Sequence, residues 1–301
     1  MSGKRPTIWK LVRRDKVALV CLAVLGVMAL AALAGSWLTG YGYETTGDSQ
    51  FALPSAKHWC GTDLHGRDVL TRVLFGAQIS LAVGVIGSLA SLVVGVSYGM
   101  VSGYWGGKVD NLMMRLVDIL YSLPRIIIVI VLIVSFDKLL RGWFEAWQMP
   151  WLERQTRIVL LFIGLGVVEW LTMARIVRGQ VLALKEQQFV LAARALGASH
   201  ASILLRHLLP NLAGVIVVYL TLTIPVVILT ESFLSFLGLG IQPPQASWGT
   251  LIADGAAVIN PVRIYWWLLV FPGLAMGVTL LCLNLLGDRM RDILDPRQLK
   301  K

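Results

Sequence analysis

The sequence predicts an all-α integral membrane protein with six transmembrane helices and both termini in the cytoplasm. Of its 301 residues, 56% are hydrophobic and 15% are charged, whereas about a quarter of the residues of a soluble domain are charged. A soluble chain of this length could not bury so much apolar surface, and the same composition excludes a disordered chain. Three cysteines in the whole chain exclude a disulfide scaffold.

Six segments are long and apolar enough to cross the roughly 30 Å of hydrocarbon in a bilayer, which takes about 20 residues of helix. They are residues 17–38, 79–101, 111–136, 158–174, 212–230 and 265–286. Four carry no charged residue, whereas the third and fourth contain a few. For the first, a cleaved signal peptide stays open as an alternative, because a basic tail precedes it and Ala32-Leu33-Ala34 resembles a cleavage site. Its apolar run is, however, longer than the about 7–15 residues of a signal peptide.

The basic residues set the expected orientation. With the amino terminus placed inside, 18 of the 27 lysines and arginines fall on the inner side, 8 fall on the outer side, and Arg125 lies within a span. Inner loops carry the excess of basic residues in membrane proteins, so both termini are expected in the cytoplasm. The net charge of +10 therefore orients the chain and is not read as a nucleic-acid-binding surface. The long loops are then 39–78 and 231–264 outside and 175–211 inside.

The inside loop is expected to form two short helices with a bend between them. Residues 185–196 are good helix formers, and Gly197 is placed to end them in a left-handed conformation. Ser199 can then begin a second helix as its N-cap. Pro210 and Asn211 are expected to interrupt the chain before the next span, because proline lacks the N–H and clashes with the preceding turn.

Ala192 and Ala193 of this loop would leave a flat patch that the backbone of another molecule could approach closely. The two helices could therefore be a docking element that projects from the membrane. They could equally be an amphipathic linker that lies on the lipid surface. The residues alone favour neither reading.

The first outside loop places Asp63, Arg67 and Asp68 close together among glycines. Gly61 and Gly66 permit turns that other residues resist, so the segment is expected to form a compact surface loop. Its charges could pair with one another, as exposed ion pairs commonly do. Alternatively, they could serve as a gate, or as a dock for a protein outside the membrane.

The third outside loop is expected to open at Glu231, directly after an uncharged span. The apolar run 233–239 that follows is too short to cross the membrane, so it is expected to dip back into it. Non-helical backbone at that depth must be covered by protein or line a cavity. Glu231 and this run are therefore candidates for an outer gate or pathway wall.

A polar stripe at helical spacing marks the third span. Its members follow each other at intervals of three and four residues, which places them on one face of a helix. They are Asn111, Arg115, Asp118, Ser122 and Arg125. At 1.5 Å per residue the stripe would extend about 21 Å, from the cytoplasmic end to about the middle of the membrane.

Charges in this stripe need partners. A charge at the centre of a span costs about 2.5–3.5 kcal/mol, so Arg125 must face protein, water or an opposite charge. Glu169 in the fourth span is its most plausible partner. Arg115 and Asp118 could simply neutralise each other near the membrane surface. Arg115, Asp118, Ser122, Arg125 and Glu169 are therefore candidates to line a path through the membrane.

The inside loop resembles the "EAA" loop of binding-protein-dependent ABC importer permeases. That pattern reads Glu-Ala-Ala, three residues, Gly, nine residues, Ile-x-Leu-Pro, and this chain matches it at Ala192, Ala193, Gly197, Leu209 and Pro210. Leu191 replaces the Glu of the pattern and His207 replaces its Ile. In this family the loop forms a coupling helix that sits in a groove of the cytoplasmic ATPase, which is a helix-in-groove mode of recognition.

Further motifs, in order along nearly the whole chain, resemble the C-type permeases of oligopeptide and dipeptide importers. They lie at residues 61–81, 103–110, 170–180, 231–255 and 287–296. The resemblance implies the type I importer permease fold in a bacterial inner membrane. It also implies a core permease domain at 79–301 with the coupling loop at 185–210, after an N-terminal unit at 1–78.

The resemblance implies several partners, namely a second homologous permease in a heterodimer, two cytoplasmic ATPase subunits, an external substrate-binding protein and the membrane lipid around the permeases. The chain has no Gly-x-x-x-x-Gly-Lys-Ser/Thr motif, so ATP and Mg²⁺ are expected on the ATPases and no cofactor or metal here. The chain is thus expected to transport oligopeptides rather than act as an enzyme. Dipeptides, nickel, glutathione or antimicrobial peptides are alternative substrates, and a proton-coupled secondary transporter with Asp118 and Glu169 as a relay is the alternative mechanism.

Overall fold

The computed structural model describes residue 13 and residues 15–260 and 262–294. Within these ranges the chain is helical and contains no β-strand, apart from an isolated bridge between Thr62 and Asp68. The predicted all-α class is therefore confirmed. Most of the predicted cytoplasmic tail at the amino terminus lies outside the described residues.

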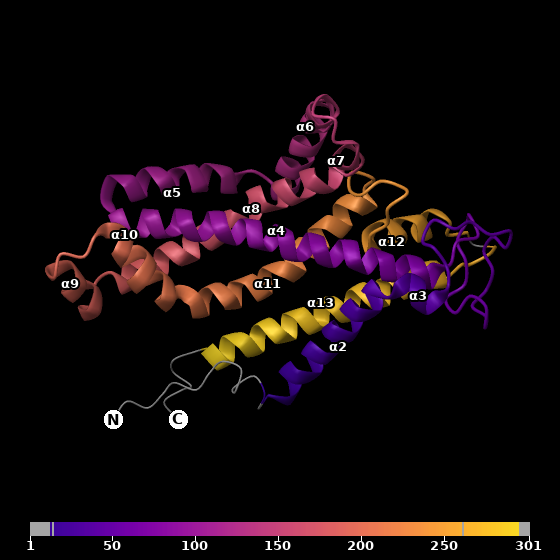
Figure 1. Cartoon of the computed structure of the whole chain (residues 1–301), viewed down its shortest axis with the longest axis horizontal. Coiled ribbons are helices and arrows are strands. Elements are labelled where there is room, and N and C mark those ends of the chain that lie inside the picture. The colour runs from indigo at the N-terminus through magenta and orange to yellow at the C-terminus, as the bar shows by residue number, and fades with distance from the viewer. Residues whose placement is uncertain (1–12, 14, 261, 295–301) are drawn as a thin grey trace.

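Five long helices run lengthwise through an elongated bundle (Figure 1). They are α2 (Lys16–Leu33), α4 (Val69–Trp105), α8 (Thr156–Leu184), α11 (Leu209–Phe236) and α13 (Trp267–Leu294). In the described part of the chain, these are the helices that are long and apolar enough to cross a membrane alone, and a bent pair adds a sixth span if it is counted as one. The predicted multi-pass architecture is thus confirmed. The first apolar segment belongs to the bundle, because α2 packs against α13 and α4.

Short helices occupy the two ends of this bundle. One end carries α9 (Gln188–Ala195), α10 (His200–Ser202) and a π-helical turn, η1 (Ile203–Leu208). The other end carries α3 (Gly35–Thr39) and α12 (Trp248–Ala257). We call them the α9 end and the α12 end; they lie at the left and the right of Figure 1.

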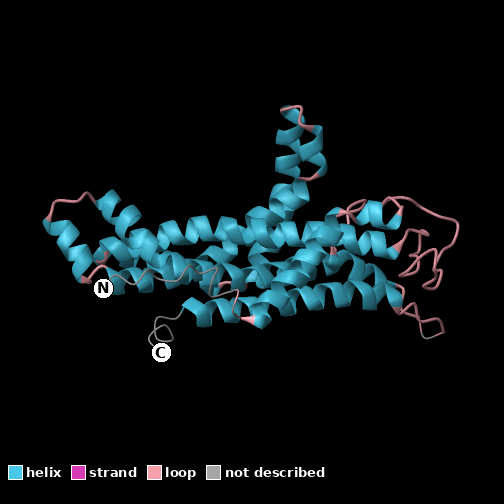
Figure 2. Cartoon of the chain, turned by 60° about the horizontal axis from the view of Figure 1, so that its bottom comes forward, coloured by secondary structure: helices cyan, strands magenta, loops and turns pink. Residues whose placement is uncertain are grey.

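The third predicted span is broken, and the expectation of one straight polar stripe along it is wrong. It consists of α5 (Gly107–Ser122) and α6 (Arg125–Ala146), which meet at an angle of 86°. Pro124 disfavours helical backbone at the residue before it, and Leu123 is accordingly extended, with φ −85° and ψ 142°. Figure 2 shows α6 and the short helix α7 (Pro150–Arg154) projecting from the bundle as a hairpin.

The closest packing in the bundle joins α4 to α8. Gly95, Gly99 and Gly103 recur at every fourth residue on the α4 face that meets α8. A Cβ at Gly99 would lie only 2.5 Å from the carbonyl oxygen of Ala174, and one at Gly103 only 2.9 Å from that of Arg178. Such spacing of small residues is typical of membrane helices whose backbones approach closely. The α4–α8 pair therefore forms a firm spine between the two ends.

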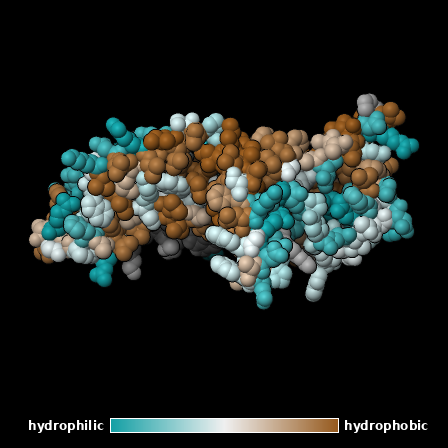
Figure 3. Space-filling view, turned by 90° about the horizontal axis from the view of Figure 1, so that it is seen from above, coloured by the Kyte–Doolittle hydropathy of each residue, from teal (hydrophilic) through white to brown (hydrophobic). Residues whose placement is uncertain are grey.

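The surface of the bundle is apolar over its middle. Figure 3 shows hydrophobic residues over the central part of one face and hydrophilic residues gathered toward both ends. Large apolar side chains are exposed on every long helix, among them Val93 on α4, Leu229 on α11 and Leu281 on α13. Exposed apolar area of this extent is expected where lipid or another membrane subunit covers the chain.

Candidate functional site

The predicted docking loop folds as α9 and a tight turn after it. Its residues are mostly good helix formers, and α9 ends at Ala195, with Leu196 as its C-cap. Gly197 follows with φ +78°, so the predicted left-handed position is confirmed. The predicted N-cap is confirmed as well, because the Ser199 hydroxyl oxygen accepts a hydrogen bond of 3.3 Å from the backbone N–H of Ser202.

One face of α9 packs on the bundle and the opposite face is exposed. Val190 is fully buried in a cluster with residues of η1, and Ala193 is buried too. Ala192 and Leu191 are exposed, and Leu196 is 89% exposed. The two alanines therefore do not form one flat patch, because Ala193 faces inward. An exposed apolar face at the end of an elongated molecule fits a surface that a partner covers.

Both ends of the loop are fastened to the last turn of α4. The Tyr104 hydroxyl lies 2.7 Å from His200 Nδ1, and the guanidinium carbon of Arg194 lies 5.9 Å from the centre of the Tyr104 ring. At the other end of the loop, Lys185 Nζ donates a hydrogen bond of 3.1 Å to the carbonyl oxygen of Gly103. A displacement of α9 would therefore be transmitted to α4 and the spine.

Pro210 does not interrupt the helix before the fifth span, so that expectation is wrong. The segment from His200 to Phe236 is one continuous helical stretch, with Leu209 and Pro210 in the first turn of α11. The π-helical turn η1 precedes them, and its wider hydrogen-bond register accommodates the missing N–H and the ring of proline. The Asn211 side-chain amide donates a hydrogen bond of 2.6 Å to the carbonyl oxygen of His207.

Polar residues of α5 join α8 rather than each other. Asp118 accepts a hydrogen bond of 2.7 Å from Arg175 Nη2, so the expected pairing of Arg115 with Asp118 is wrong. The Arg175 guanidinium also lies 4.1 Å from the centre of the Tyr121 ring. Arg175 and Asp118 lie 57 positions apart in the sequence. A pattern of three- and four-residue spacing, which relates only neighbours on one helix, could not predict this pair.

The predicted partnership of Arg125 and Glu169 is confirmed at 3.9 Å between Nη1 and Oε1. Arg125 is the first residue of α6 and donates a hydrogen bond of 2.6 Å to the Tyr121 hydroxyl. The Glu169 side chain is only 9% exposed, whereas that of Arg125 is 42% exposed. Glu169 is thus a mostly buried acid that depends on one accessible cation. Asn111, Arg115 and Ser122 are exposed on α5.

A stronger ion pair, between α5 and α8, was not predicted. Arg178 donates two hydrogen bonds to Asp110, of 2.6 Å from Nε and 2.5 Å from Nη2. The Ser102 hydroxyl donates a third, of 2.5 Å, to the same carboxylate. This bidentate geometry is the strong form of an Arg–carboxylate pair. Asp110 and Arg178 lie in motifs that the sequence reading had identified, but 68 positions apart.

The charges of the first loop pair with one another, as one of the two readings expected. The Asp63 carboxylate accepts hydrogen bonds of 2.7 Å from Arg67 Nε and 2.6 Å from Arg72 Nη1. Asp68 caps α4 through the backbone N–H of Thr71 at 2.8 Å and lies 3.0 Å from His58 Nδ1. The loop is therefore internally satisfied, and Asp68 fixes the position where α4 begins.

The same cluster shifts the acidity of Asp63 and reaches α12. Burial alone would raise the pKa of Asp63, but the Arg67 backbone hydrogen bond and the charges of Arg72 and Arg67 hold that pKa below its ordinary value. Arg72 Nη1 also lies 3.5 Å from Asp254 Oδ2 on α12. One buried guanidinium thus ties the first outside loop, α4 and α12 together.

Glu231 does not open a loop, and the run after it does not leave the helix at that point. α11 continues to Phe236, so Glu231 is a helical residue, and it is completely buried. Its carboxylate accepts hydrogen bonds of 2.7 Å from the Ser235 hydroxyl and 3.3 Å from the Ser80 hydroxyl. The backbone N–H of Trp248 donates to the Ser80 oxygen at 3.2 Å. Glu231 therefore holds α4, α11 and α12 together at the α12 end.

Among the described residues, no group of three or more His, Cys, Asp or Glu side chains could hold a metal ion. The polar clusters described above join helices, through paired acids and bases or, at Glu231, through a carboxylate and serine hydroxyls. The arrangement positions helices and a surface loop, and it is suited to relaying movement.

Two family descriptions match the sequence. Residues 95–300 match "Binding-protein-dependent transport system inner membrane component", which covers well over half of the chain. Residues 7–54 match "N-terminal TM domain of oligopeptide transport permease C", a region that contains α2.

Curated relatives are similar over almost the whole chain. The oligopeptide transport system permease protein OppC of Escherichia coli K12 is 44% identical, over 97% of this chain and 92% of that protein. The dipeptide transport system permease protein DppC of Bacillus subtilis is 42% identical, over 98% of this chain and 88% of that protein. OppC of Haemophilus influenzae is also 42% identical, over 94% and 86% of the two chains.

Proposed function

The chain belongs to the family of binding-protein-dependent transport system inner membrane components, and on that premise we propose that it imports short peptides through a path it shares with a second permease. As a member of this family, the chain is a multi-pass permease subunit of an ATP-driven ABC importer in a bacterial inner membrane, not a catalytic subunit. The family implies ATPase and binding-protein partners. The peptide substrate rests on relatives that are named for oligopeptide and dipeptide transport.

The observation that carries the coupling role is the exposed face of α9. Val190 anchors α9 on the bundle while Leu191, Ala192 and Leu196 stay exposed, and Tyr104 links the loop to α4. We place the groove of a cytoplasmic ATPase subunit over this face. Binding of ATP would close the ATPases, and α9 would move with them and tilt the helices toward an outward-open path.

Five residues have separate roles in this coupling proposal. Ala192 allows close approach of the ATPase backbone, and the inward-facing Ala193 seats α9 on the bundle. Gly197 supplies the left-handed turn after α9, and Leu209 and Pro210 begin the span that follows the π-helical turn. Leu191, which stands where the family pattern has Glu, is 46% exposed and would make an apolar contact in place of a charged one.

We propose that one side of the translocation path is formed where α5, α6 and α8 meet. Arg115, Asp118, Ser122 and Arg125 are exposed there, and Glu169 lies behind Arg125. Exposed charge on a membrane helix needs water or protein against it, and a path between two permeases supplies both. Glu231 supports the outer end of the path from inside the chain rather than lining it, since it is completely buried.

The remaining partners are proposed from the surfaces that need covering. We propose a distinct permease subunit against the α5–α6 side, two ATPase subunits that hold ATP and Mg²⁺, and lipid around the apolar middle. Asp63, Arg67 and Asp68 hold the first outside loop rigid and would present it to the binding protein. In this scheme residues 1–78 form the N-terminal unit and residues 79–301 the core permease, and α4 (Val69–Trp105) runs across the boundary and joins the two.

Transport in proteoliposomes tests the proposed function. The chain would be reconstituted with its partner permease and ATPases, and the uptake of radiolabelled Ala-Ala-Ala would be measured with the binding protein added outside. Uptake is expected to require ATP and to persist with a protonophore present. Uptake driven by a proton gradient without ATP would contradict the mechanism. ATP-driven uptake of nickel or glutathione, but of no peptide, would contradict the substrate class.

A further inference from the structure

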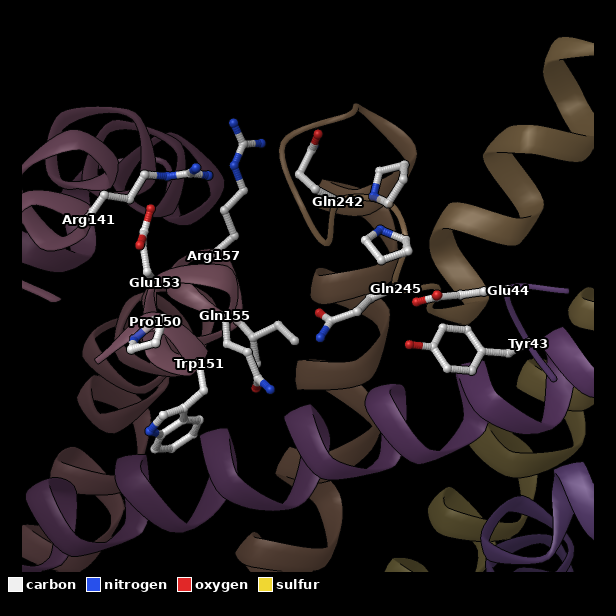
Figure 4. Close-up of a pocket in the computed structure, with 13 residues that line it drawn as sticks. Tyr43, Glu44, Arg141, Pro150, Trp151, Glu153, Gln155, Arg157, Gln242 and Gln245 are labelled. Atoms are coloured by element: carbon white, nitrogen blue, oxygen red, sulfur yellow. The ribbon is translucent and has the colours of Figure 1, made fainter. Parts of the chain in front are cut away.

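A cavity of about 670 Å³ opens at the external end of the chain (Figure 4). Segments distant in sequence form it: the stretch after α3, the hairpin of α6 and α7, the start of α8, and the loop between α11 and α12. Its volume falls within the range of about 300–1,000 Å³ that small-molecule sites occupy. The cavity lies beyond the α5–α6 break, away from the residues assigned above to the path.

Basic residues form one wall of this cavity. Arg141 and Arg157 both line it, and they share a single carboxylate, that of Asp137. The Asp137 carboxylate lies 3.2 Å from Arg141 Nε and 3.6 Å from Arg157 Nε. The second distance is longer than the about 2.7–2.9 Å of a charge-assisted hydrogen bond, and the buried Nε of Arg157 has no hydrogen-bond partner among the described residues. That Nε faces Asp137 Oδ1, which is likewise buried and has no hydrogen-bond partner among those residues, but the Arg157 side chain as a whole is 29% exposed, so its terminal N–H groups retain donor capacity toward an anion.

Glu153 stands in the same wall beneath Arg141 (Figure 4). Arg141 thus has two acidic neighbours, Asp137, with which it forms an ion pair, and Glu153. Arg157 has only the long contact with the shared Asp137 carboxylate. Of the two guanidiniums, Arg157 is the one left to bind an added carboxylate.

An acidic residue forms the opposite wall. Figure 4 shows the Glu44 carboxylate and the Tyr43 hydroxyl pointing into the cavity from the side across from Arg157. Burial first, and then the neighbouring Glu44 side chain, raise the pKa of Tyr43 to about 12, so the phenol stays protonated. Tyr43 is held in place by stacking on Phe75, with ring centres 3.8 Å apart. The Tyr43 hydroxyl is therefore held at this wall of the cavity, beside the Glu44 carboxylate.

Neutral hydrogen-bonding groups and apolar rings lie between the two charged walls. Gln155 and Gln245 place their amides in the middle of the cavity, and Gln242 lies at its rim (Figure 4). Each amide group both donates and accepts hydrogen bonds, as a peptide backbone does. Trp151 and Pro243 add apolar surface that can contact side chains without selecting one of them.

We infer that this cavity binds one free short peptide, with its carboxylate at Arg157 and its ammonium group at Glu44. This assignment rests on the proposed peptide substrate and adds to it a binding site in the permease itself. A cation at one end, an anion at the other and amides between them complement a zwitterion that carries both of its termini. An inserted loop of a folded binding protein offers neither terminus, so the charges favour the free peptide.

Binding to the assembled importer without its binding protein tests the inference. The probes are Ala-Ala-Ala, its C-terminal amide and its N-acetyl form, each titrated by calorimetry into the complex in nanodiscs. Arg157→Gln is expected to weaken Ala-Ala-Ala binding at least about tenfold, since a charge-assisted hydrogen bond is lost. The same variant should leave the already weak binding of the amide unchanged. Glu44→Gln should show the converse pattern, with the N-acetyl peptide unaffected.

The matched control is Arg263→Gln, since Arg263 is an exposed arginine of the outside loop that precedes α13 and does not line the cavity. It should bind all three probes like the wild type. Equal weakening of all probes by Arg157→Gln, or no binding of Ala-Ala-Ala to the wild type, would overturn the inference. The inference would also be overturned if Arg157→Gln or Glu44→Gln weakened binding of the binding protein to the complex and left the binding of all three peptides unchanged. ATP-driven peptide uptake by the same preparations tests the proposed function separately, because uptake can persist when this site is absent.

Discussion

At the external end Glu231 is completely buried and surrounded by serine hydroxyls, whereas at the cytoplasmic end Leu196 is 89% exposed. The external end is likewise closed by Arg72, which joins Asp63 on the first outside loop to Asp254 on α12. The cytoplasmic end keeps one buried anchor, Val190, and leaves the other face of α9 uncovered.

The difference shows how each end is held: buried polar groups of this chain join the helices at the external end, whereas the outer face of α9 is left uncovered. Buried polar groups that satisfy each other make a region rigid, and one of them left alone is costly. An exposed apolar face costs little in a monomer and gains free energy when it is covered. The spine of α4 and α8 links the two ends, so a movement imposed at α9 meets a rigid structure outside.

The largest effect is expected from Glu231→Ala, which would remove the buried carboxylate that holds α4, α11 and α12 together at the external end. The change leaves the hydroxyls of Ser80 and Ser235 without their acceptor and opens a cavity, at a cost of about 3 kcal/mol in the free energy of unfolding. Thermal unfolding in nanodiscs measures it. Glu231→Gln is the matched control, since its amide can still pair with the serines and should cost far less. If the alanine variant were as stable as the wild type, Glu231 would not hold the helices of the external end together.

At the cytoplasmic end, Gly197→Val is expected to disrupt coupling to the ATPases without unfolding the bundle. A β-branched residue is strained at φ +78°, so the turn after α9 must change and the exposed face moves out of position. ATPase co-purification and peptide uptake should both fall about tenfold or more, while the unfolding temperature hardly changes. Gly197→Asn should restore part of both activities, because asparagine tolerates this conformation.

Gly26→Val provides the control for that experiment. Gly26 is a helical glycine of α2 with open space around its Cα, so valine fits there without a positive φ. It should leave uptake and ATPase binding as in the wild type. Normal ATPase co-purification and peptide uptake in Gly197→Val would show that coupling does not depend on the left-handed turn after α9.

A smaller effect is expected from Arg125→Gln, which lies between the two ends. The substitution removes the cation next to the mostly buried Glu169, and an uncompensated buried acid is unfavourable. Peptide uptake should fall several-fold while ATPase co-purification stays normal. Arg141→Gln, at an arginine of α6 with a similarly exposed side chain, serves for comparison of stability. Unchanged uptake of all peptides by Arg125→Gln would exclude the pathway role.

The smallest effect is a pH dependence of the external end. The folded protein holds the pKa of Asp63 below its ordinary value, so the folded state binds this proton less readily than the unfolded state does. The stabilisation is therefore full above about pH 4, near the ordinary pKa of aspartate, and is lost as the pH falls below it. The unfolding temperature of the wild type should drop on acidification through this range. Asp63→Asn should be less stable at pH 7 and should lose less on acidification.

Local signals in the sequence predicted local structure well. The apolar runs, the left-handed Gly197 and the Ser199 cap each depend on a few neighbouring residues, and the structure confirms them. The break at Leu123 was missed although Pro124 signals it, because the regular spacing of the polar residues favoured one straight helix. Pro210 was misread in the opposite sense, because a π-helical turn absorbs it.

Pairings between distant segments could be predicted only in part. Arg125 with Glu169 was found because an isolated charge in a span demands a partner and few acids are available. Arg178 with Asp110 was missed because the two lie 68 positions apart. Arg175 with Asp118 was missed because Arg115, nearer in sequence, was taken as the partner of Asp118. The burial of Glu231 depends on Ser80, which lies 151 positions away, and no local pattern carries that information.

The most direct test of the claim that the exposed face of α9 contacts an ATPase subunit is photo-crosslinking from position 196. Leu196 would be replaced by a photo-reactive residue in the assembled importer, and the products identified by mass spectrometry. The account predicts crosslinks to an ATPase subunit. The control position is Trp37, which is 95% exposed but lies at the external end, and it should give none to an ATPase. Crosslinks from position 196 to lipid alone would contradict the account and favour a linker that lies on the membrane.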